Sequence, residues 1–125
     1  YIGRCALFKE KKGTWVYASY LIRIRVDEEK VTPEYLVKYL QSEKARKQFL
    51  SITRTSAGNY NINTKGIKWI TVCLPPIPEQ HKIANILLTI DKKLKLERNK
   101  KAKLERIKKG FMDLLLTGKV RVKVN

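Results

Sequence analysis

The chain has little of the chemistry that an active site requires. Its 125 residues contain one histidine, two cysteines and 11 acidic side chains. The acidic residues are scattered along the chain, so they do not form the spaced cluster of carboxylates and lysine with which a nuclease holds and uses Mg²⁺. We therefore expect no metal site, no catalytic residue and a protein that is not an enzyme by itself.

Known catalytic and cofactor motifs are also missing. The chain has no nucleophile motif of the G-x-S-x-G type, no P-loop and no Gly-rich turn for a nucleotide or for S-adenosylmethionine. A methyltransferase domain would need such a turn and an N/D-P-P-Y/F-type motif. LPPIP (74–78) is not that motif, because neither an amide nor a carboxylate precedes its prolines. His81 has no cysteine or carboxylate cluster beside it, so an exposed residue at a helix start is the expected role.

Long apolar runs and a cysteine framework are absent as well. No run approaches the roughly 18 apolar residues that a membrane span requires. Cys5 and Cys73 are interpreted as free thiols of a cytoplasmic protein, with a disulfide as the alternative. The chain opens on Tyr1 rather than on Met, and YIGRCALF already has the composition of a structured segment. We therefore expect a fragment whose upstream part is missing.

What the chain has in excess is positive charge. Lys and Arg total 28, and the formal net charge is +17. Residues 1–78 hold 14 basic and 6 acidic side chains, and residues 79–125 hold 14 and 5, so both halves contribute. A polyanion is the expected partner, and nucleic acid is the commonest one. The alternative, the surface of a heat-adapted protein, predicts nearly balanced signs.

The first 76 residues predict a small domain of mixed strands and helix. YASYLIRIRV (17–26) alternates as a half-buried strand, with Arg23 and Arg25 on its polar face. That face either contacts phosphate or is simply solvated. CALF (5–8) is the expected partner strand, and IKWITVCL (67–74) is β-branched and predicts a further strand.

A helix and a loop are predicted between these strands. Thr32-Pro33-Glu34 is a good helix start, because Thr caps, Pro suits the first position and Glu favours the positive end of the dipole. The helix is predicted over residues 33–50 as one moderately amphipathic element. TRTSAGNYNIN (53–63) is a loop by composition.

From residue 77 the pattern changes to one long helix, predicted to end at Thr117-Gly118 with Gly as its cap. Forty residues would extend about 60 Å, which is more than a core of about 75 residues can cover. The partner helix should therefore come from another copy or from a missing part of the same polypeptide. The expected helix-packing residues are Ile83, Ile86, Leu87, Ile90, Leu94, Leu104, Ile107, Phe111 and Leu114. Gly110 suggests a close helix approach or a bend, and KVRVKV (119–124) alternates as a short strand.

The basic run at 92–109 holds ten Lys or Arg and two Glu. It could contact the DNA backbone, dock on an acidic protein surface, or form a solvated helix face, which is the usual fate of such runs. These three interpretations stay open.

The start and the end of the long helix carry a family resemblance. LPPIPEQHKIANIL (74–87) closely resembles the LPP-x-x-EQ-x-x-IA-x-IL opening of the conserved helices in specificity subunits of type I restriction–modification enzymes, and Asp91 also fits. GFMDLLLTGKVRV (110–122) resembles the C-terminal end of those subunits. Upstream, YASYLIRIRV, the helix start at 32–36 and the Gly-Asn loop are more loosely similar to the family's target recognition domains.

The resemblance implies a non-catalytic DNA-recognition subunit. Such subunits carry two target recognition domains, each reading one half of a split DNA site, and two antiparallel helices that fix the spacing. Methyltransferase (modification) subunits dock around the helices, and S-adenosylmethionine, ATP and Mg belong to those partners and to the restriction subunit. This chain would then comprise a partial target recognition domain (1–76), a spacer or dimerisation helix (77–118) and a short C-terminal strand or tail (119–125). The expected fold is α+β.

Double-stranded DNA would be read by two kinds of contact, since basic side chains fix register on phosphate and polar side chains read base edges. Arg is suited to guanine and Asn to adenine, and Gly58 would let the backbone approach closely. The base-reading candidates are Arg54, Ser56, Gly58, Asn59, Tyr60, Asn61 and Asn63, and the phosphate candidates are Lys9, Lys11, Lys12, Arg23 and Arg25. A plain surface loop is the alternative for 53–63. The rival function is a coiled-coil interaction module with a basic surface outside restriction.

Overall fold

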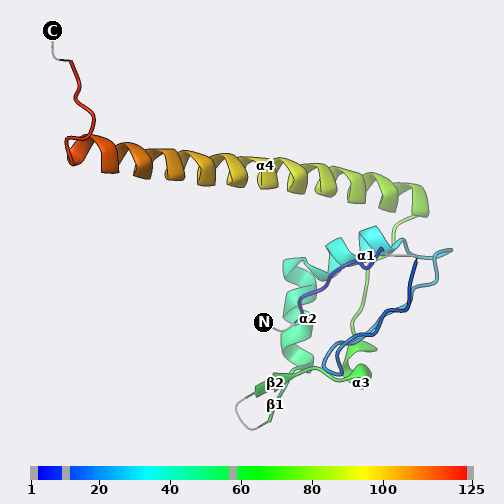
Figure 1. Cartoon of the computed structure of the whole chain (residues 1–125). Coiled ribbons are helices and arrows are strands. Elements are labelled where there is room, and N and C mark those ends of the chain that lie inside the picture. Colours follow the sequence, from blue (N-terminus) through cyan, green and yellow to red (C-terminus); the bar gives the residue numbers. More distant parts are fainter. Residues whose placement is uncertain (1–2, 10–11, 57–58, 124–125) are drawn as a thin grey trace. The chain divides into compact units, whose positions relative to one another are not determined.

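The computed structural model describes residues 3–9, 12–56 and 59–123, and for 54–56 and 59–61 it describes the backbone (Figure 1). The elements, in chain order, are α1 (Pro33–Leu40), α2 (Glu43–Ile52), β1 (Arg54–Ser56), β2 (Asn59–Asn61), α3 (Thr64–Ile67) and α4 (Ile77–Leu116). The chain divides into two compact units, Tyr1–Ile86 and Leu87–Asn125, so the first turns of α4 belong to the first unit. The functional division proposed at residue 76 stays a prediction.

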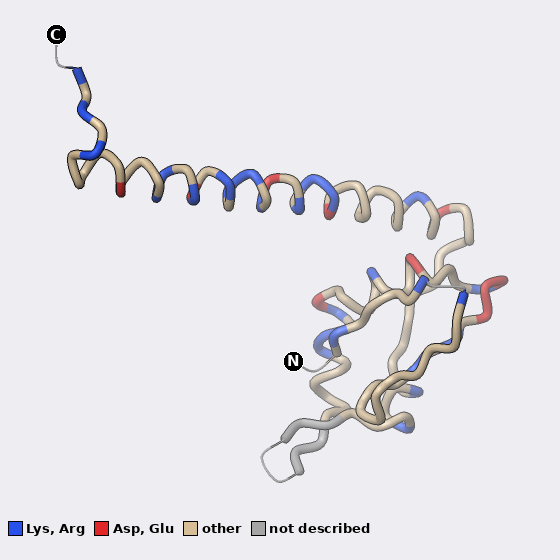
Figure 2. Tube along the Cα trace, in the orientation of Figure 1, with Lys and Arg blue, Asp and Glu red and all other residues tan. Residues whose placement is uncertain are grey.

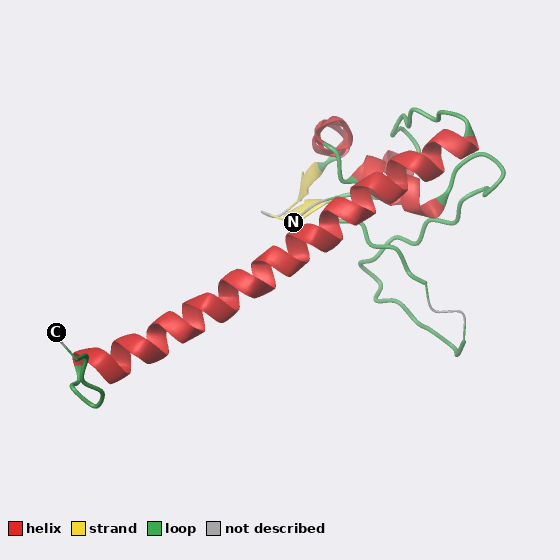
Figure 3. Cartoon of the chain, turned by 90° about the horizontal axis from the view of Figure 1, so that it is seen from above, coloured by secondary structure: helices red, strands yellow, loops and turns green. Residues whose placement is uncertain are grey.

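The predicted α+β fold is wrong, because the chain is built from helices and irregular segments (Figure 3). Apart from the three-residue strands β1 and β2, the described residues form no strand. The segments 5–8, 17–26 and 67–74, together with the described part of 119–124, are all outside any sheet. An alternating pattern is not enough for a strand, because the backbone also needs a neighbouring strand to pair with.

The segment 17–26 illustrates this failure. The backbone N–H of Leu21 donates to the carbonyl of Ala18 at 2.9 Å, which forms a turn inside the predicted strand. The segment is also not half-buried, since Tyr20 is 84% exposed. The sequence of this segment therefore alternates like a strand, but most of its apolar side chains are exposed.

Side chains from α1 and α2 replace a strand partner along the segment that precedes α4. Gln48 donates from Nε2 to the carbonyl of Thr71 at 3.0 Å and accepts from the N–H of Thr71 at 2.7 Å. The hydroxyl of Tyr35 donates to the carbonyl of Cys73 at 2.7 Å. Because these side chains satisfy backbone groups, the segment is held in place without a β-ladder.

The helix predicted over 33–50 is two helices. Its start is confirmed, because the N–H of Tyr35 donates to the hydroxyl of Thr32 at 3.4 Å and Pro33 occupies the first position. The helix then stops at Gln41, and Ser42 takes an extended conformation and caps α2 by accepting from the N–H of Ala45 at 3.3 Å. A serine with this capping geometry competes with helix continuation, which is why α1 and α2 are separate.

The first unit has a small apolar core made by α1 and α2. Its buried members are Leu40, Ala45 and Phe49. The partly buried residues packed against them are Cys5, Leu36, Tyr39, Ile52, Ile62 and Ile70. Gly3 has a φ of +72°, and a Cβ there would lie 2.8 Å from Cδ2 of Phe49. Only glycine fits that position without displacing the core.

One buried side chain joins the start of α4 to α1. Gln80 has no exposed surface, and its Oε1 accepts from the N–H of Thr32 at 2.9 Å. Its Nε2 donates to the carbonyls of Lys30 at 2.9 Å and Pro75 at 2.8 Å. One turn later, Ala84 is also buried. The first turn of α4 is therefore held by hydrogen bonds to residues about 50 positions earlier.

The second unit contains the rest of α4 and a short tail. The helix ends at Leu116, and Gly118, with a φ of +69°, donates its N–H to the carbonyl of Leu115, as predicted for a glycine cap. The helix runs through Gly110, where an added Cβ would meet no atom within 4 Å. The close helix approach or bend expected at Gly110 stays a prediction.

Candidate nucleic-acid interface

The segment that carries most of the predicted base-reading residues is a hairpin, not a plain loop. β1 and β2 pair antiparallel, with Arg54 opposite Asn61 and Ser56 opposite Asn59. Successive positions of a strand alternate between its two faces. Positions 54, 56, 59 and 61 therefore belong to one face of the hairpin, and position 60 belongs to the other.

Both ends of the hairpin are tied to helices (Figure 1). At its start, the hydroxyl of Thr53 donates to the carbonyl of Phe49 at 2.6 Å and so joins the hairpin to α2. At its end, Asn63 caps α3 by accepting from the N–H of Gly66 at 2.7 Å. The hairpin is thus a short ribbon whose two ends are fixed to α2 and α3 by these side-chain hydrogen bonds.

The hydrogen bond that caps α3 involves Asn63, one of the residues predicted to read a base. Since Oδ1 of Asn63 is bound to the backbone of α3, this side chain has a structural role in the first turn of that helix. Gly58, at the predicted tip, and Lys11 lie outside the described residues. The roles of Arg54, Ser56, Asn59, Tyr60 and Asn61 stay predictions.

The predicted phosphate contacts lie in different settings. Nζ of Lys9 forms an ion pair with Glu34 at 3.1 Å, so this lysine already has an acidic neighbour. The carbonyl of Lys12 accepts from Nε1 of Trp15 at 2.8 Å, and the Lys12 side chain is exposed. Arg23 and Arg25 are exposed on an irregular segment. The predicted sheet does not bring these residues together, because that sheet does not form.

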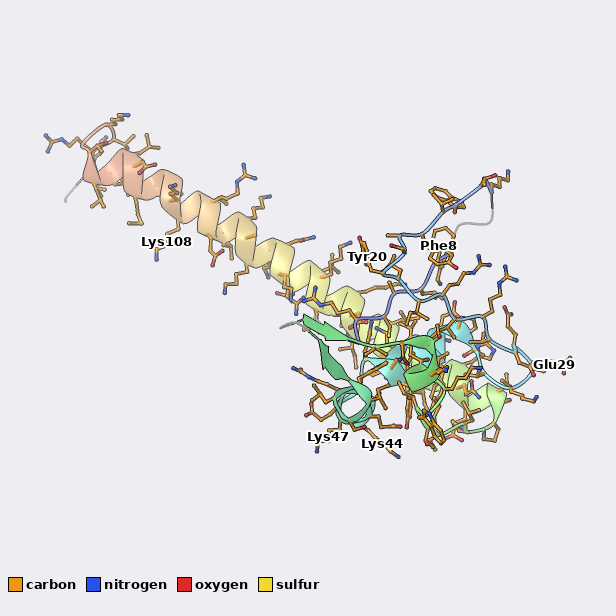
Figure 4. The ribbon with its side chains drawn as sticks, turned by 90° about the horizontal axis from the view of Figure 1, so that it is seen from below. Phe8, Tyr20, Glu29, Lys44, Lys47 and Lys108 are labelled. Atoms are coloured by element: carbon orange, nitrogen blue, oxygen red, sulfur yellow. The ribbon has the colours of Figure 1, made fainter. Side chains whose placement is uncertain are left out.

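Several exposed residues near the hairpin were missed by the sequence analysis. Lys44 and Lys47 point away from α2 in Figure 4, and both are exposed. Lys65 and Lys68 are exposed in and just after α3, and Trp69 is 79% exposed. Their closeness in sequence to the Asn-rich segment is the signal that could have identified them, since basic and aromatic side chains together favour nucleic acid.

The basic run of α4 is distributed around the helix rather than along one side. Figure 2 shows Lys and Arg along much of the helix, with few acidic residues between them. Successive positions turn by about 100°, so the ten basic residues of 92–109 point in all directions. The predicted helix-packing residues from Ile86 onward are exposed too, for example Ile86 at 61% and Phe111 at 57%, while Ile83 is half-buried. Their role in helix pairing stays a prediction.

A few titratable groups are shifted by their surroundings. The hydrogen bond from Lys9 is the main cause that lowers the pKa of Glu34. Asp27 has a lowered pKa because Lys30 donates to it and the N–H of Glu29 also points at it. Burial raises the pKa of the Cys5 thiol and of the Tyr35 hydroxyl. These groups are scattered over the first unit, so no acid–base pair is assembled from them.

Neither a metal-binding cluster nor a membrane-spanning helix is found among the described residues. No group of three or more histidine, cysteine, aspartate or glutamate side chains in the described ranges is placed to hold a metal ion. Within the same residues, no helix is both long enough and apolar enough to cross a membrane.

A family model settles the class of the chain. Residues 1–106 match the type I restriction modification DNA specificity domain. Because this match covers most of the chain, the chain belongs to that family. No solved structure matches it.

Three relatives that the chain matches are named as specificity subunits. A Methanocaldococcus jannaschii protein named as a type I restriction enzyme MjaX specificity subunit is 37% identical over 94% of this chain and 28% of its own length. The EcoKI specificity subunit of Escherichia coli is 33% identical over 66% of this chain and 18% of its own length. The MjaVIII specificity subunit of M. jannaschii is 31% identical over 94% of this chain and 25% of its own length. The chain thus spans between 18% and 28% of the length of these three relatives.

Proposed function

We propose that this chain is the DNA-reading and scaffolding part of a type I specificity subunit. In this proposal the first unit reads one half of a bipartite DNA site, and α4 sets the distance to the other half. Membership of the DNA specificity domain family is the observation that carries the proposal. It also sets aside the rival interaction module outside restriction.

The hairpin of β1 and β2 is the proposed reading element. Its backbone register assigns Arg54, Ser56, Asn59 and Asn61 to one face, and these are residue types that donate to or accept from base edges. A two-stranded ribbon is narrow enough to enter a major groove. Because its two ends are capped onto α2 and α3, such a ribbon would keep its orientation when it binds.

Exposed basic residues around the hairpin are the proposed phosphate contacts. Lys44 and Lys47 on α2, and Lys65 and Lys68 at α3, lie on the elements that anchor the hairpin. Phosphate contacts of this kind fix register on the duplex without reading sequence. The net charge of +17 supports a polyanion as the ligand.

The chemistry is proposed to belong to partner subunits. The methyltransferase subunits would bind S-adenosylmethionine, and the restriction and translocation subunit would use ATP and Mg, while this chain supplies no catalytic group. The assembly would act in the cytoplasm. A second helix, from the same longer polypeptide or from another copy, would pair with α4.

The test is a binding measurement on a subunit that contains this chain, assembled with its methyltransferase partner. We expect selection of one bipartite sequence from a random DNA pool, and an affinity that falls steeply as salt rises, because phosphate contacts release counterions. Equal affinity for every sequence in the pool would refute the specificity role.

A further inference from the structure

One side of α4 carries only positive charge along the middle of the helix. This side is a stripe of five exposed residues, which we call the basic stripe: Lys92, Lys95, Asn99, Lys103 and Arg106. They follow one another at intervals of three or four residues, and at about 100° per residue they fall within a sector of roughly 80°. The stripe is about 21 Å long, since each residue of a helix adds about 1.5 Å. All five residues belong to the second unit.

The acidic residues of the same run lie on other sides of the helix. Within residues 92–109 they are Glu97 and Glu105, which are about 160° and 120° from the middle of the stripe at 100° per residue. Glu105 forms an ion pair at 3.8 Å with Lys101, which is also outside the stripe. Asp91 and Asp113 come before its first member and after its last. Between them the stripe is a basic surface without an acidic member.

This segregation of charge is not typical of a helix face that is merely solvated. Such a face usually mixes the two signs, because Glu and Lys three or four residues apart attract each other. In the basic stripe Lys92 and Lys95 are three residues apart, and so are Lys103 and Arg106. Like charges at this spacing destabilise a helix. A bound polyanion would offset their repulsion, which gives the charge distribution a function.

The stripe stays accessible when α4 pairs with another helix. Among the predicted helix-packing residues, Ile90, Leu94 and Leu104 lie about 140° or more from the middle of the stripe at 100° per residue. Pairing through these residues covers the opposite side of α4. The basic stripe is then still free to bind a different partner.

Duplex DNA fits both the charge and the length of the stripe. Each DNA strand carries one phosphate for every 3.4 Å of helix axis, so about 21 Å of duplex presents roughly six phosphates on each strand. Contacts of Lys and Arg with phosphate hold a duplex without reading its sequence. In the proposed function α4 sets the distance between the two half-sites, and the DNA between them is the part that the hairpin does not read.

We propose that the basic stripe of α4 binds the phosphate backbone of the DNA between the two halves of the bipartite site. The proposal rests on the proposed function and adds a second contact with DNA to it. This contact supplies affinity, whereas the hairpin supplies sequence preference.

The stripe is tested with a double variant, Lys95→Gln with Lys103→Gln, in a subunit that contains this chain and is assembled with its methyltransferase partners. The matched control is Lys93→Gln with Lys100→Gln, which removes the same charge from the same helix at positions about 100° or more from the middle of the stripe. The affinity for the selected DNA is measured over a range of salt concentrations.

The stripe variant should bind at least about tenfold more weakly at about 0.1 M salt, and its salt slope should fall by about two phosphate contacts. The control should lower the slope by less than about one contact. Equal effects in the two variants, or no effect in either, would mean that the stripe makes no specific contact with DNA and would overturn the proposal.

The position of the contact is tested with DNA in which uncharged methylphosphonates replace the phosphates between the two half-sites. The unaltered assembly should bind this DNA at least about fivefold more weakly, because the stripe loses its charged partners. The stripe variant should bind the two DNAs alike, since the contact is already missing. An equal loss of affinity in both assemblies would place the contact elsewhere on the protein and would overturn the proposal.

An acidic protein surface is the competing partner of the stripe. If the stripe docks on a methyltransferase subunit, the stripe variant should assemble poorly in size-exclusion chromatography while the salt slope of the remaining complex stays unchanged, and this result would overturn the proposal. Failure of the proposed function has a different signature, because the unaltered assembly would then bind every DNA sequence equally, whatever the stripe variant does.

Discussion

The backbone N–H of Thr32 donates to Oε1 of Gln80 at 2.9 Å, across 48 positions of sequence. This bond joins the cap of α1 to the first turn of α4, and both side chains are buried. Gln80 also bonds the carbonyls of Lys30 and Pro75. One amide thus satisfies three backbone groups where the proline-rich joint meets the start of α1.

Gln80→Leu should destabilise the first unit by more than about 2 kcal/mol, because a side chain of similar size would leave three backbone groups without partners. Urea unfolding followed by circular dichroism measures the change. The matched control is Gln41→Leu, which removes two exposed hydrogen bonds, one donated to the carbonyl of Cys5 at 3.2 Å and one accepted from Nζ of Lys38 at 3.5 Å. It should cost less than about 1 kcal/mol, because water can replace the lost partners at an exposed position. Equal losses of unfolding free energy in the two variants would contradict the stabilising role of the buried Gln80 hydrogen bonds.

Glu34→Gln should make the free energy of unfolding depend less on pH in the acid range. The hydrogen bond from Lys9 lowers the pKa of the Glu34 carboxyl below its ordinary value. A lowered carboxyl pKa gives stability that is complete above the unfolded pKa and is lost as the pH falls through the folded one. The unaltered chain should therefore be more stable than the variant at pH 7, by up to about 1 kcal/mol for a surface pair, and the two should converge in acid.

The control for this pH series is Glu43→Gln, which removes a carboxylate from the first turn of α2 and leaves the Lys9–Glu34 ion pair intact. It separates the ion pair from the general effect of an acidic residue at a helix start. A pH profile of Glu34→Gln that stays parallel to that of the unaltered chain would show that the ion pair does not form in solution.

The two cysteines should differ in reactivity. Cys5 is half-buried, its thiol donates to the carbonyl of Gly3 at 3.4 Å, and burial raises its pKa. Cys73 is exposed. Since the thiolate is the reactive form, iodoacetamide at about pH 8 should modify Cys73 roughly tenfold faster, as followed by peptide mass mapping. In denaturant the two rates should become equal, and equal rates in the folded chain would contradict the packing of Cys5.

Local signals explain which parts of the fold could be predicted from sequence. The cap at Thr32, the proline at 33 and the glycine at 118 act within one turn of the helix ends that they define, and those ends are where the pattern placed them. The break at Gln41–Ser42 was also local, but the apolar residues on both sides continued the helical pattern and concealed it.

The predicted strands were wrong, because whether a segment becomes a strand depends on distant partners. Residues 67–74 are β-branched, yet Gln48 and Tyr35 hold the backbone of this segment through side-chain bonds that span 23 and 38 positions. Likewise, Gln80 was identified only as part of the motif at 74–87, and its three hydrogen bonds follow from the folded structure alone.

The candidate site was predicted by composition but not by geometry. The segment 53–63 was identified from its Asn, Ser and Gly content, whereas the shared face of positions 54, 56, 59 and 61 follows from a register that composition does not give. Asn63 belonged to the same run and is the cap of α3. Lys44 and Lys47 were missed because they lie inside the helix predicted over 33–50, to which no contact with DNA was assigned.

Arg54→Ala should reduce binding by about 1–3 kcal/mol at one base position and leave the preference at the other positions unchanged, if Arg54 reads a base. The measurement is the affinity for a set of sites with single base changes, made on the assembled subunit. The control is Lys65→Ala, which should weaken binding equally on every sequence and reduce the salt slope by about one phosphate contact. A uniform loss for Arg54→Ala would reassign that residue to phosphate.

The most direct test of the account is an exchange of residues 53–63 for the corresponding segment of a specificity subunit with a different target. The exchange is made in a subunit that contains this chain, assembled with its methyltransferase partners, and the methylated sites are mapped by sequencing. The account predicts that one half of the bipartite site changes, while the other half and the spacing between them stay the same. An unchanged recognition site in an active, stably assembled enzyme would contradict the claim that this hairpin reads DNA.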